Sequence, residues 1–362
     1  MGKQRISTLL GILGLVAMAC GGAPTAASPT PTTPAATSAA AASVAPTAKP
    51  GELDDATIAK AKVEGEIVLY TSLSSSDAKK VGDAFAASAK SYGVKITVNR
   101  KSSESLVTQF MTEVKAGKVL ADVLETGGLD LFQAIKAGYI EPWKVPAAAD
   151  FPADLKDANG MWHAARLGVE TISYNTSAVK DADAPKTFED ATDAKWKGKC
   201  LIEATDIEVL LGIGERKYKG DSAKAQDLVT KLMANCTPSN GHTETLDKLI
   251  AGEGAIFWGG HAHSTEQKRN DKAPVDYMQA EGVVTIDGPG LVKGAAHPNA
   301  ARVFINWYLS DGQKVLADLF RVPAKPGAAN PRLLPKTIYY TGPTLAEKFA
   351  TYQEIWTKTV KK

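Results

Sequence analysis

The sequence has little cysteine and only one long apolar run. That run, from Leu9 to Met18, is about ten residues long, which is too short to cross a bilayer as a helix. No later stretch of the 362 residues approaches membrane-spanning length. The formal net charge is +2, and the basic residues are dispersed and form no stripe with aromatic side chains. Nucleic acid is therefore not an expected partner.

Catalytic motifs are also missing. The chain has no Gly-x-Ser-x-Gly, no His-Glu-x-x-His and no phosphate loop with Gly-Lys-Ser/Thr. The glycine pairs Gly252/Gly254 and Gly288/Gly290 are interpreted as turns. We therefore expect a protein that is not an enzyme and has no cofactor, with a bound metal ion left open.

The N-terminus has the pattern of an exported protein. Lys3 and Arg5 precede the apolar run, and the small-residue site Ala17-Met18-Ala19-Cys20 follows it. This site resembles the bacterial lipobox and predicts a signal peptide over residues 1–20, with a lipid on Cys20. Ordinary cleavage beside an incidental cysteine is the alternative. Residues 21–50, rich in Ala, Pro and Thr, predict a disordered spacer, so we expect an extracytoplasmic domain anchored to the membrane by lipid.

Two further cysteines, Cys200 and Cys236, form an even pair. In an oxidising compartment the simplest prediction is a disulfide. The alternative is a zinc site, for which only His242 is near in sequence.

The mature chain alternates short β-type runs with helical runs, which predicts βαβ units around parallel strands. In the first series we expect strands at 66–70, 94–98 and 121–124 and helices at 77–89, 105–116 and 129–137. In the second series we expect strands at 199–203 and 255–258, with helices at 223–233 and 244–251. Extended runs at 168–175 and 283–286 would form a hinge, and helices are expected at 300–319 and 345–359.

Ligands of open α/β sheets bind beyond the carboxyl ends of the strands. The loops at these ends are rich in hydroxyl groups and glycines, and each precedes a predicted helix. The candidate contacts are Thr71, Ser72, Ser74, Ser103, Glu125 and Thr126 in the first series, Asp206, His261 and His263 in the second, and Tyr174, with Arg166 or Glu170, in the hinge.

Each loop also has a simpler interpretation. Ser, Thr and Asp cap helices, and Ser76, Asp77 and Ser103 are expected to act mainly as caps. Helix N-termini that converge on one site would instead present N–H groups to an anion. His261 and His263, with Glu266 nearby, leave a metal site open, but ligand hydrogen bonding or packing against Trp258 is favoured.

Several segments in order resemble the solute-binding proteins of bacterial ABC importers, in the branch of the ferric-iron-binding proteins. The segments are Gly65–Thr71, Ala121–Leu124, Ala137–Pro142, Ile172–Asn175, Trp196–Lys199, Gly252–Ile256 and His297–Gln313. The resemblance implies an α/β, two-lobed periplasmic-binding-protein-like fold. Each lobe would be a mixed, mostly parallel sheet flanked by helices, with extended segments as the hinge. Lobe 1 would comprise 51–167 plus about 279–330, and lobe 2 would comprise 168–278 plus about 331–362.

The resemblance also implies a monomer that delivers its ligand to a permease and ATPase. The iron ligands of the branch do not carry over. Ser74 falls at the first-loop ligand, Glu125 is near the carboxylate position, and Gly260 and His261 fall on the tyrosine pair. The pair Tyr339-Tyr340 lies far downstream. A small anion, favoured by the hydroxyl-rich loops, or a free or chelated metal ion is therefore expected.

Three alternatives remain open. One is ferric iron bound by other ligands. Another is a metal-dependent hydrolase that uses His261, His263 and a carboxylate. The third is a lipoprotein that senses its ligand and signals to a membrane kinase.

Overall fold

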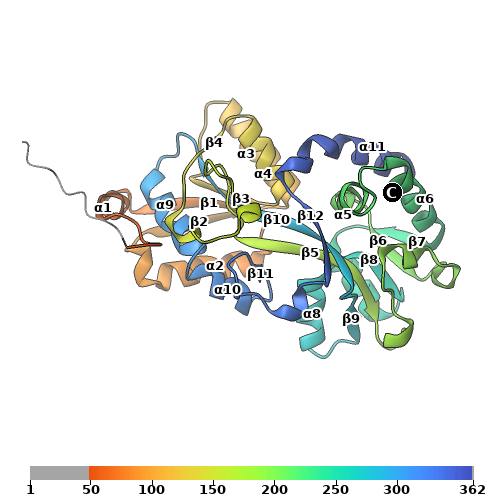
Figure 1. Ribbon diagram of the computed structural model, residues 1–362. Helices are drawn as coiled ribbons and strands as arrows, with labels where there is room; N and C mark the ends of the chain where they lie inside the picture. Colours follow the sequence, from red (N-terminus) through yellow and green to blue (C-terminus); the bar gives the residue numbers. More distant parts are fainter. Residues whose placement is uncertain (1–48, 361–362) are drawn as a thin grey trace, which may run out of the picture. The chain divides into compact units, whose positions relative to one another are not determined.

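A computed structural model describes residues 49–360, and its helices and strands alternate along the chain as predicted (Figure 1). The first series is α1 (Asp55–Glu64), β1 (Glu66–Thr71), α2 (Ser75–Ala87), β2 (Lys95–Arg100), α3 (Ser103–Lys115), β3 (Val123–Thr126), α4 (Gly128–Lys136) and β4 (Ile140–Glu141). The second series is β5 (Arg166–Asn175), β6 (Cys200–Glu203), α5 (Ile207–Gly212), α6 (Ser222–Asn235), β7 (Cys236–Ser239), α7 (His242–Ala251), β8 (Ile256–His261), α8 (Ala262–Asn270) and β9 (Val275–Tyr277).

The elements from residue 281 onward pack against elements of both series. They are β10 (Glu281–Val292), α9 (Pro298–Tyr308), α10 (Gly312–Asp318), β11 (Val322–Pro323), β12 (Thr337–Thr341) and α11 (Phe349–Thr359). Short 3₁₀ segments lie at Ala89–Ser91, Pro146–Ala148, Ala153–Leu155, Asp181–Asp183, Phe188–Thr192, Ala194–Trp196, Pro331–Leu333 and Pro343–Lys348, and a π-helical turn at Ile213–Lys217. The single helix predicted at 300–319 is two helices, because the chain turns between α9 and α10.

The strands pair in the order β2-β1-β3-β10-β5-β8-β6-β7. The pairs β1/β2, β1/β3, β6/β7 and β6/β8 are parallel, whereas β10 and β5 pair antiparallel with their neighbours β3 and β8 and with each other. The strand order thus reads as two mainly parallel groups joined by two long antiparallel strands. We call the elements packed around β1 the first lobe and those packed around β6 the second lobe.

The joining strands β5 and β10 confirm the two extended runs of the sequence and are longer than predicted. One prediction here is wrong: Gly288-Pro289-Gly290 is not a turn, because β10 continues through it and pairs with β3. Glycine is needed for close approach, since a side chain at Gly288 would collide with the carbonyl of His163. A glycine inside a strand often marks such a contact and not a turn.

Each lobe has its own core. In the first, the rings of Phe304 and Trp307 from α9 lie edge-on to Phe85 of α2. In the second, Trp258 contacts Phe188 and Trp356, and α11 packs on α5 and α6. The predicted assignment of residues to the two lobes stays a prediction.

The predicted disulfide is present. Cys200 and Cys236 are joined with an S–S distance of 2.02 Å and a Cα–Cα distance of 4.2 Å. They are the first residues of β6 and β7 and are direct partners in the parallel register. The zinc alternative for these cysteines is therefore wrong.

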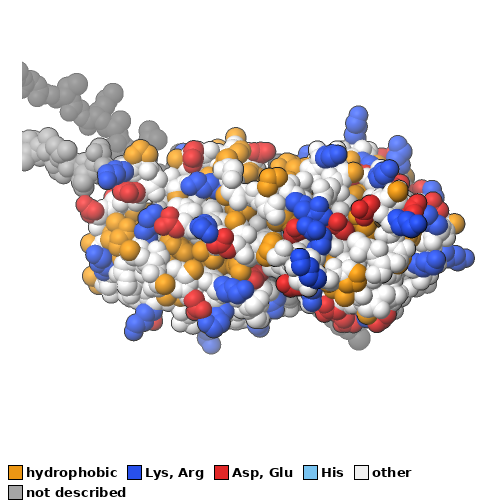
Figure 2. Space-filling view, turned by 90° about the horizontal axis from the view of Figure 1, so that it is seen from below, with side chains coloured by type: hydrophobic (Ala, Val, Ile, Leu, Met, Phe, Trp, Pro, Cys, Tyr) orange, Lys and Arg blue, Asp and Glu red, His pale blue; other side chains and the backbone are white. Residues whose placement is uncertain are grey.

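The predicted membrane anchor cannot be followed in the structure. The signal peptide 1–20, the lipid on Cys20 and nearly all of the spacer 21–50 lie outside the described residues. Among the helices between residues 49 and 360, none combines the length and hydropathy of a membrane span. On the face shown in Figure 2, basic side chains lie among acidic ones, as the dispersed charges of the sequence predict.

Acid should destabilise the protein through His163, which is buried just before β5. Its Nε2 accepts the N–H of Val145 at 3.5 Å, and burial, with Lys156 nearby, lowers the pKa of His163 to about 4. The unfolded state takes up this proton near pH 6.5, so the free energy of unfolding should fall by about 3 kcal/mol at most between pH 6.5 and about 4. Urea titrations across this range test the slope. His163→Gln should remove that part of it, and an unchanged slope would contradict the assignment.

Candidate functional site

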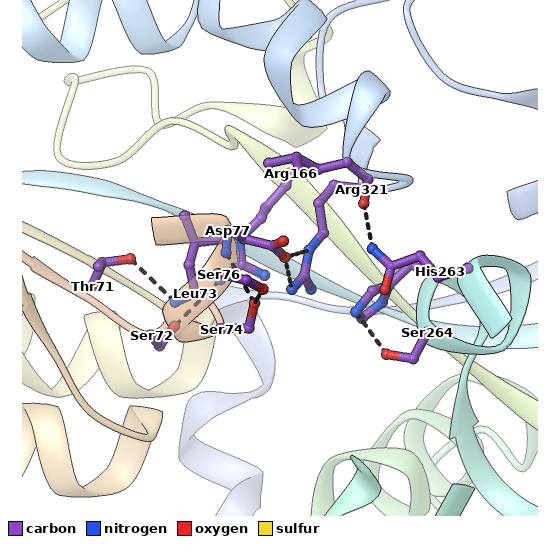
Figure 3. A network of polar contacts seen from close by, with 12 residues as sticks. Thr71, Ser72, Leu73, Ser74, Ser76, Asp77, Arg166, His263, Ser264 and Arg321 are labelled. Carbon is purple, nitrogen blue, oxygen red and sulfur yellow. Dashed lines mark hydrogen bonds and ion pairs between the residues drawn. The ribbon is translucent and has the colours of Figure 1, made fainter. Parts of the chain in front are cut away.

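Side chains from both lobes meet where the carboxyl ends of β1, β3, β6 and β8 lie. The first-lobe side chains follow β1 and lie at the end of β3, and the second-lobe side chains lie in the loops after β6 and β7 and at the end of β8. Figure 3 shows Asp77 and Arg321 of the first lobe on one side and His263 of the second lobe on the other. We call this group of side chains the interlobe site.

Arg166, at the start of β5, is the centre of the first-lobe half. Its Nε donates to Glu125 at 3.1 Å, its Nη1 donates to Asp287, and its Nη2 donates to the Ser72 hydroxyl at 3.3 Å. Thr71 donates to the other oxygen of Glu125. The structure therefore joins four predicted residues into one network and adds Asp287, which was not among the candidates.

A second arginine, Arg321, forms an ion pair with Asp77 of α2, with Nη2–Oδ2 at 2.6 Å (Figure 3). Phe320 adopts the left-handed backbone conformation (φ 59°) just after α10, and this turn brings Arg321 to the site. The sequence interpretation missed Arg321 and expected Asp77 to be a cap. That expectation is wrong because α2 begins earlier, with Ser74 at its N-cap.

The remaining first-lobe candidates have mainly local roles. The Ser74 hydroxyl accepts the N–H of Asp77 at 3.2 Å and lies 3.1 Å from the Ser76 hydroxyl, so Ser76 is not the cap. Ser103 is the first residue of α3, and the N-cap is Ser102, so the expected cap was misplaced by one residue. Thr126 is fully buried at the end of β3, and its hydroxyl has no hydrogen-bond partner among the described residues.

Three histidines line the second-lobe half. The rings of His242 and His261 stack with centroids 3.8 Å apart and planes 9° apart. The ring of His263 follows at 5.2 Å from His261, and its Nε2 lies 3.0 Å from the Ser264 hydroxyl. Two of the three were predicted, whereas His242 had been weighed only as a partner for the cysteines.

A β-bulge orients this half. Thr171 pairs with Gly260 and Ile172 with Trp258, so Gly259 is the extra residue in β8. Gly259 has φ 85°, and a side chain there would collide with the carboxylate of Asp206. The bulge sets the alternation of β8 so that His261 pairs with Glu170 of β5.

Carboxylates surround the histidines. His242 Nε2 lies 2.8 Å from Asp206 Oδ1, and His261 Nε2 lies 3.5 Å from Glu170 Oε1. The other oxygens, Glu170 Oε2 and Asp206 Oδ2, are buried without a hydrogen-bond partner within the described part of the chain. A buried carboxylate oxygen without a partner is costly, so these atoms are candidates for contact with a ligand.

The protonation of the histidines differs across the stack. Burial, aided by the positive charges of Arg321 and Arg166, lowers the pKa of His261 and His263 well below the usual value. Burial also opposes the charged form of His242, but Asp206 outweighs it and raises the pKa of His242. Near neutral pH, His261 and His263 are therefore neutral imidazoles.

Four carboxyl groups at the site have raised pKa values, mainly because of burial. Burial raises the pKa of Glu170 well above its ordinary range, with Asp206 as the next cause, and raises the pKa of Asp206 to about 6. Burial raises the pKa of Asp130 to about 6 with help from Glu104, and that of Glu208 to about 8 with help from Asp130. Both Asp130 and Glu208 are half-buried. Asp130 belongs to the first lobe and Glu208 to the second, so carboxyl groups from the two lobes lie near each other at the site.

Tyr174 is not part of this group. It lies near the far end of β5, where its neighbours in register are Ile256 and Asp276. Its hydroxyl donates to Asp181 at 3.2 Å. Its position therefore offers no support for the predicted contact between Tyr174 and a ligand.

The residues at the position of the tyrosine pair are held by β8. Gly260 pairs with Thr171, and a β-carbon at Gly260 would collide with the hydroxyl of Ser173. Tyr339 and Tyr340 lie in β12 and pair with Val283 and Val284. Neither segment forms a pair of tyrosines at the interlobe site.

Comparisons with known proteins agree with the fold. Residues 80–338 match the family model described as bacterial extracellular solute-binding protein. The Fe(3+)-binding periplasmic protein of Serratia marcescens is 25% identical over 290 residues, which cover 76% of this chain and 84% of that protein. Iron-bound HitA from Pseudomonas aeruginosa has a TM-score of 0.70 at 20% identity, covering 81% of this chain and 99% of its own. AfuA from Actinobacillus pleuropneumoniae, with fructose-6-phosphate bound, has a TM-score of 0.70 at 20% identity, covering 82% and 98%.

Proposed function

The chain belongs to the bacterial extracellular solute-binding proteins, and from this premise we propose that it captures a cation between its lobes for an ABC importer. The family membership and the two-lobed fold agree with the resemblance found in the sequence. The cation is the finer part of the proposal. One observation carries it: the interlobe site has more buried and half-buried carboxyl groups than its own basic residues neutralise.

The arginines of the site are already matched. Arg166 is paired with Glu125 and Asp287, and Arg321 is paired with Asp77. The ion pairs of the described residues leave Asp130 and Glu208 without a lysine or arginine, and Glu170 has only the neutral ring of His261. A bound cation would let these carboxyl groups ionise, so ligand binding and charge neutralisation support each other.

The anion that the loops had favoured has weaker support. The hydroxyl of Ser74 caps α2, and that of Thr71 is bonded to Glu125. An anion would also lie beside Asp130, whose pKa of about 6 leaves it ionised at neutral pH, and like charges at short range disfavour binding. The solved relative with fructose-6-phosphate shares the fold, but its identity of 20% transfers no ligand.

Binding would act through closure. A cation held between the lobes offsets the mutual repulsion of Asp130 and Glu208 and so shifts the population towards the arrangement in which the lobes face each other. A membrane permease and its ATPase would receive the closed, monomeric form. The proposal includes a lipid on Cys20 that keeps the protein at the membrane, which rests on the sequence pattern of residues 1–20 alone.

Thermal unfolding of the full chain with separate additions of Zn²⁺, spermidine, phosphate and fructose 6-phosphate tests the proposal. At least one cation should stabilise the protein, by about 2.7 kcal/mol at 100 times its dissociation constant. Because the pKa of Asp130 is about 6, the affinity for the cation should rise between about pH 5 and about pH 7 as the acid ionises.

A double variant separates the site from general charge effects. Asp130→Asn with Glu208→Gln should weaken the stabilisation, whereas Asp311→Asn, at an exposed carboxylate paired with Lys90, should not. Stabilisation by the anions alone, or equal effects in both variants, would overturn the proposal.

A further inference from the structure

We propose that Glu170, His242 and His261 form a binding site for a divalent transition-metal ion, which is the cargo of the protein. This inference rests on the proposed function, because it names which cation the interlobe site takes and which side chains bind it. The three residues come from β5, the start of α7 and the end of β8. They are far apart in sequence and are brought together by the second-lobe sheet.

The donor atoms are close enough to share one ion. One ligand atom from each of Glu170, His242 and His261 lies within 4.8 Å of the other two. Backbone pairing fixes two of them, since Glu170 and His261 are direct partners across β5 and β8. His242 is fixed by Gly241, which has φ 77° and donates its N–H to Glu203 at 3.0 Å.

An independent observation points to a ligand at this place. Glu170 is only 7% exposed, and its Oε2 has no hydrogen-bond partner among the described residues. The site therefore has a buried, unpartnered oxygen beside two imidazoles. A metal ion would satisfy this oxygen at the same time as it takes nitrogen donors.

A second group of possible donors, Glu203, Asp206 and His242, fits less well. The carboxylate of Glu203 already accepts three hydrogen bonds, from the N–H and hydroxyl of Thr205 and from the N–H of Gly241. Glu203 therefore holds two loops in place. Asp206, 2.8 Å from His242 Nε2, has the position of a carboxylate that orients a ligating imidazole.

The donor set selects the class of metal. Two imidazoles and one carboxylate suit borderline divalent ions such as Zn²⁺, Ni²⁺ or Co²⁺ better than hard cations that prefer oxygen alone. Three protein donors leave positions open for water or for His263, whose ring centroid lies 5.2 Å from that of His261.

The stacked rings predict a rearrangement. A metal ion must lie in the plane of each imidazole that binds it, and planes only 9° apart at 3.8 Å do not meet at one ion. One ring must therefore rotate when the metal enters, which breaks the stack. Loss of the stacked arrangement of His242 and His261 would therefore accompany metal binding and can be observed independently of the affinity.

Calorimetric titration of the full chain with Zn²⁺ tests the site, and Co²⁺ and Cu²⁺ serve as spectroscopic probes. We expect one Zn²⁺ per chain. His242→Ala, His261→Ala and Glu170→Gln should each abolish or strongly weaken binding, and Asp206→Asn should weaken it by about 10–100-fold. The electron paramagnetic resonance spectrum of the Cu²⁺ complex should show two coupled nitrogens, and one fewer in either alanine variant.

His297→Gln is the matched control, because His297 bonds to Asp122 in the first lobe, away from the site. Zn²⁺ binding that this change removes, or that the three site variants leave intact, would overturn the inference. Binding of spermidine at the interlobe site without any Zn²⁺ binding would also overturn it, while the proposed function would stand. Failure of every cation to bind would overturn both.

Discussion

Arg166→Met is expected to lower the free energy of unfolding by about 3–5 kcal/mol, among the largest effects of any single change in this chain. The guanidinium lies between the carboxylates of Glu125 and Asp287, and the three residues are 6%, 1% and 6% exposed. Removal of the arginine leaves two buried carboxyl groups close together without a counter-charge. Urea unfolding at neutral pH, with an unchanged dependence on denaturant, measures the loss.

Two further variants test the cause. Glu125→Gln and Asp287→Asn, added to Arg166→Met, should recover much of the lost stability, because no buried charge then remains unpaired. Lys79→Met is the matched control, since its pair with Asp83 is exposed and should contribute less than about 1 kcal/mol. If Arg166→Met cost no more than Lys79→Met, the buried network would not have the role assigned to it.

Several features of the fold and of the site around Arg166 could be predicted from the sequence. The alternation of strands and helices predicted both lobes, because the period of hydrophobic residues is a local property that tertiary contacts rarely reverse. The cysteine pair also followed from simple arithmetic. Arg166 and Glu125 were both among the candidates, and the structure shows them in contact. Only the grouping of Arg166 with Glu125 depends on the rule that loops at the carboxyl ends of strands meet at one edge of a sheet.

The residues that were missed or misinterpreted depend on contacts between segments distant in the sequence. Arg321 reaches Asp77 across 244 residues, and no local pattern marks it. His242 follows β7 and meets His261 only because a bulge at Gly259 sets the face of β8, and a bulge leaves just one glycine in the sequence as its trace. Gly288 was misread for a similar reason, since a turn and a close backbone approach both require glycine.

The charge of the site was likewise hidden from the sequence. Hydroxyl-rich loops suggested an anion, but hydroxyls such as those of Ser74 and Thr71 are used within the first lobe. Asp130 and Glu208 lie in different lobes, 78 positions apart in sequence, and their mutual effect appears only when the lobes are placed together. The net charge of a binding site depends on all the side chains that the fold brings together there. It cannot be predicted from each loop separately.

The second large effect concerns the disulfide. Cys200→Ala with Cys236→Ala should lower the free energy of unfolding by about 4 kcal/mol, because the bond closes a loop of 36 residues in the unfolded chain. The cysteines begin β6 and β7, and β7 is the last strand in the sheet order, so it has a neighbour on one side only. The same measurement on the wild type in reductant should give the same loss, whereas a loss only in the double variant would indicate a packing defect.

The position of the disulfide predicts that its removal should leave cation binding intact. The cysteines pair at the amino ends of β6 and β7, whereas Asp206 and His242 follow the carboxyl ends of those strands. Glu203 still holds the two loops together through Thr205 and Gly241 when the disulfide is gone. The double variant should therefore bind its cation as tightly as the wild type at temperatures where it is fully folded. Titration below its unfolding transition measures this. A matching loss of affinity would mean that the disulfide, and not the Glu203 contacts, positions His242.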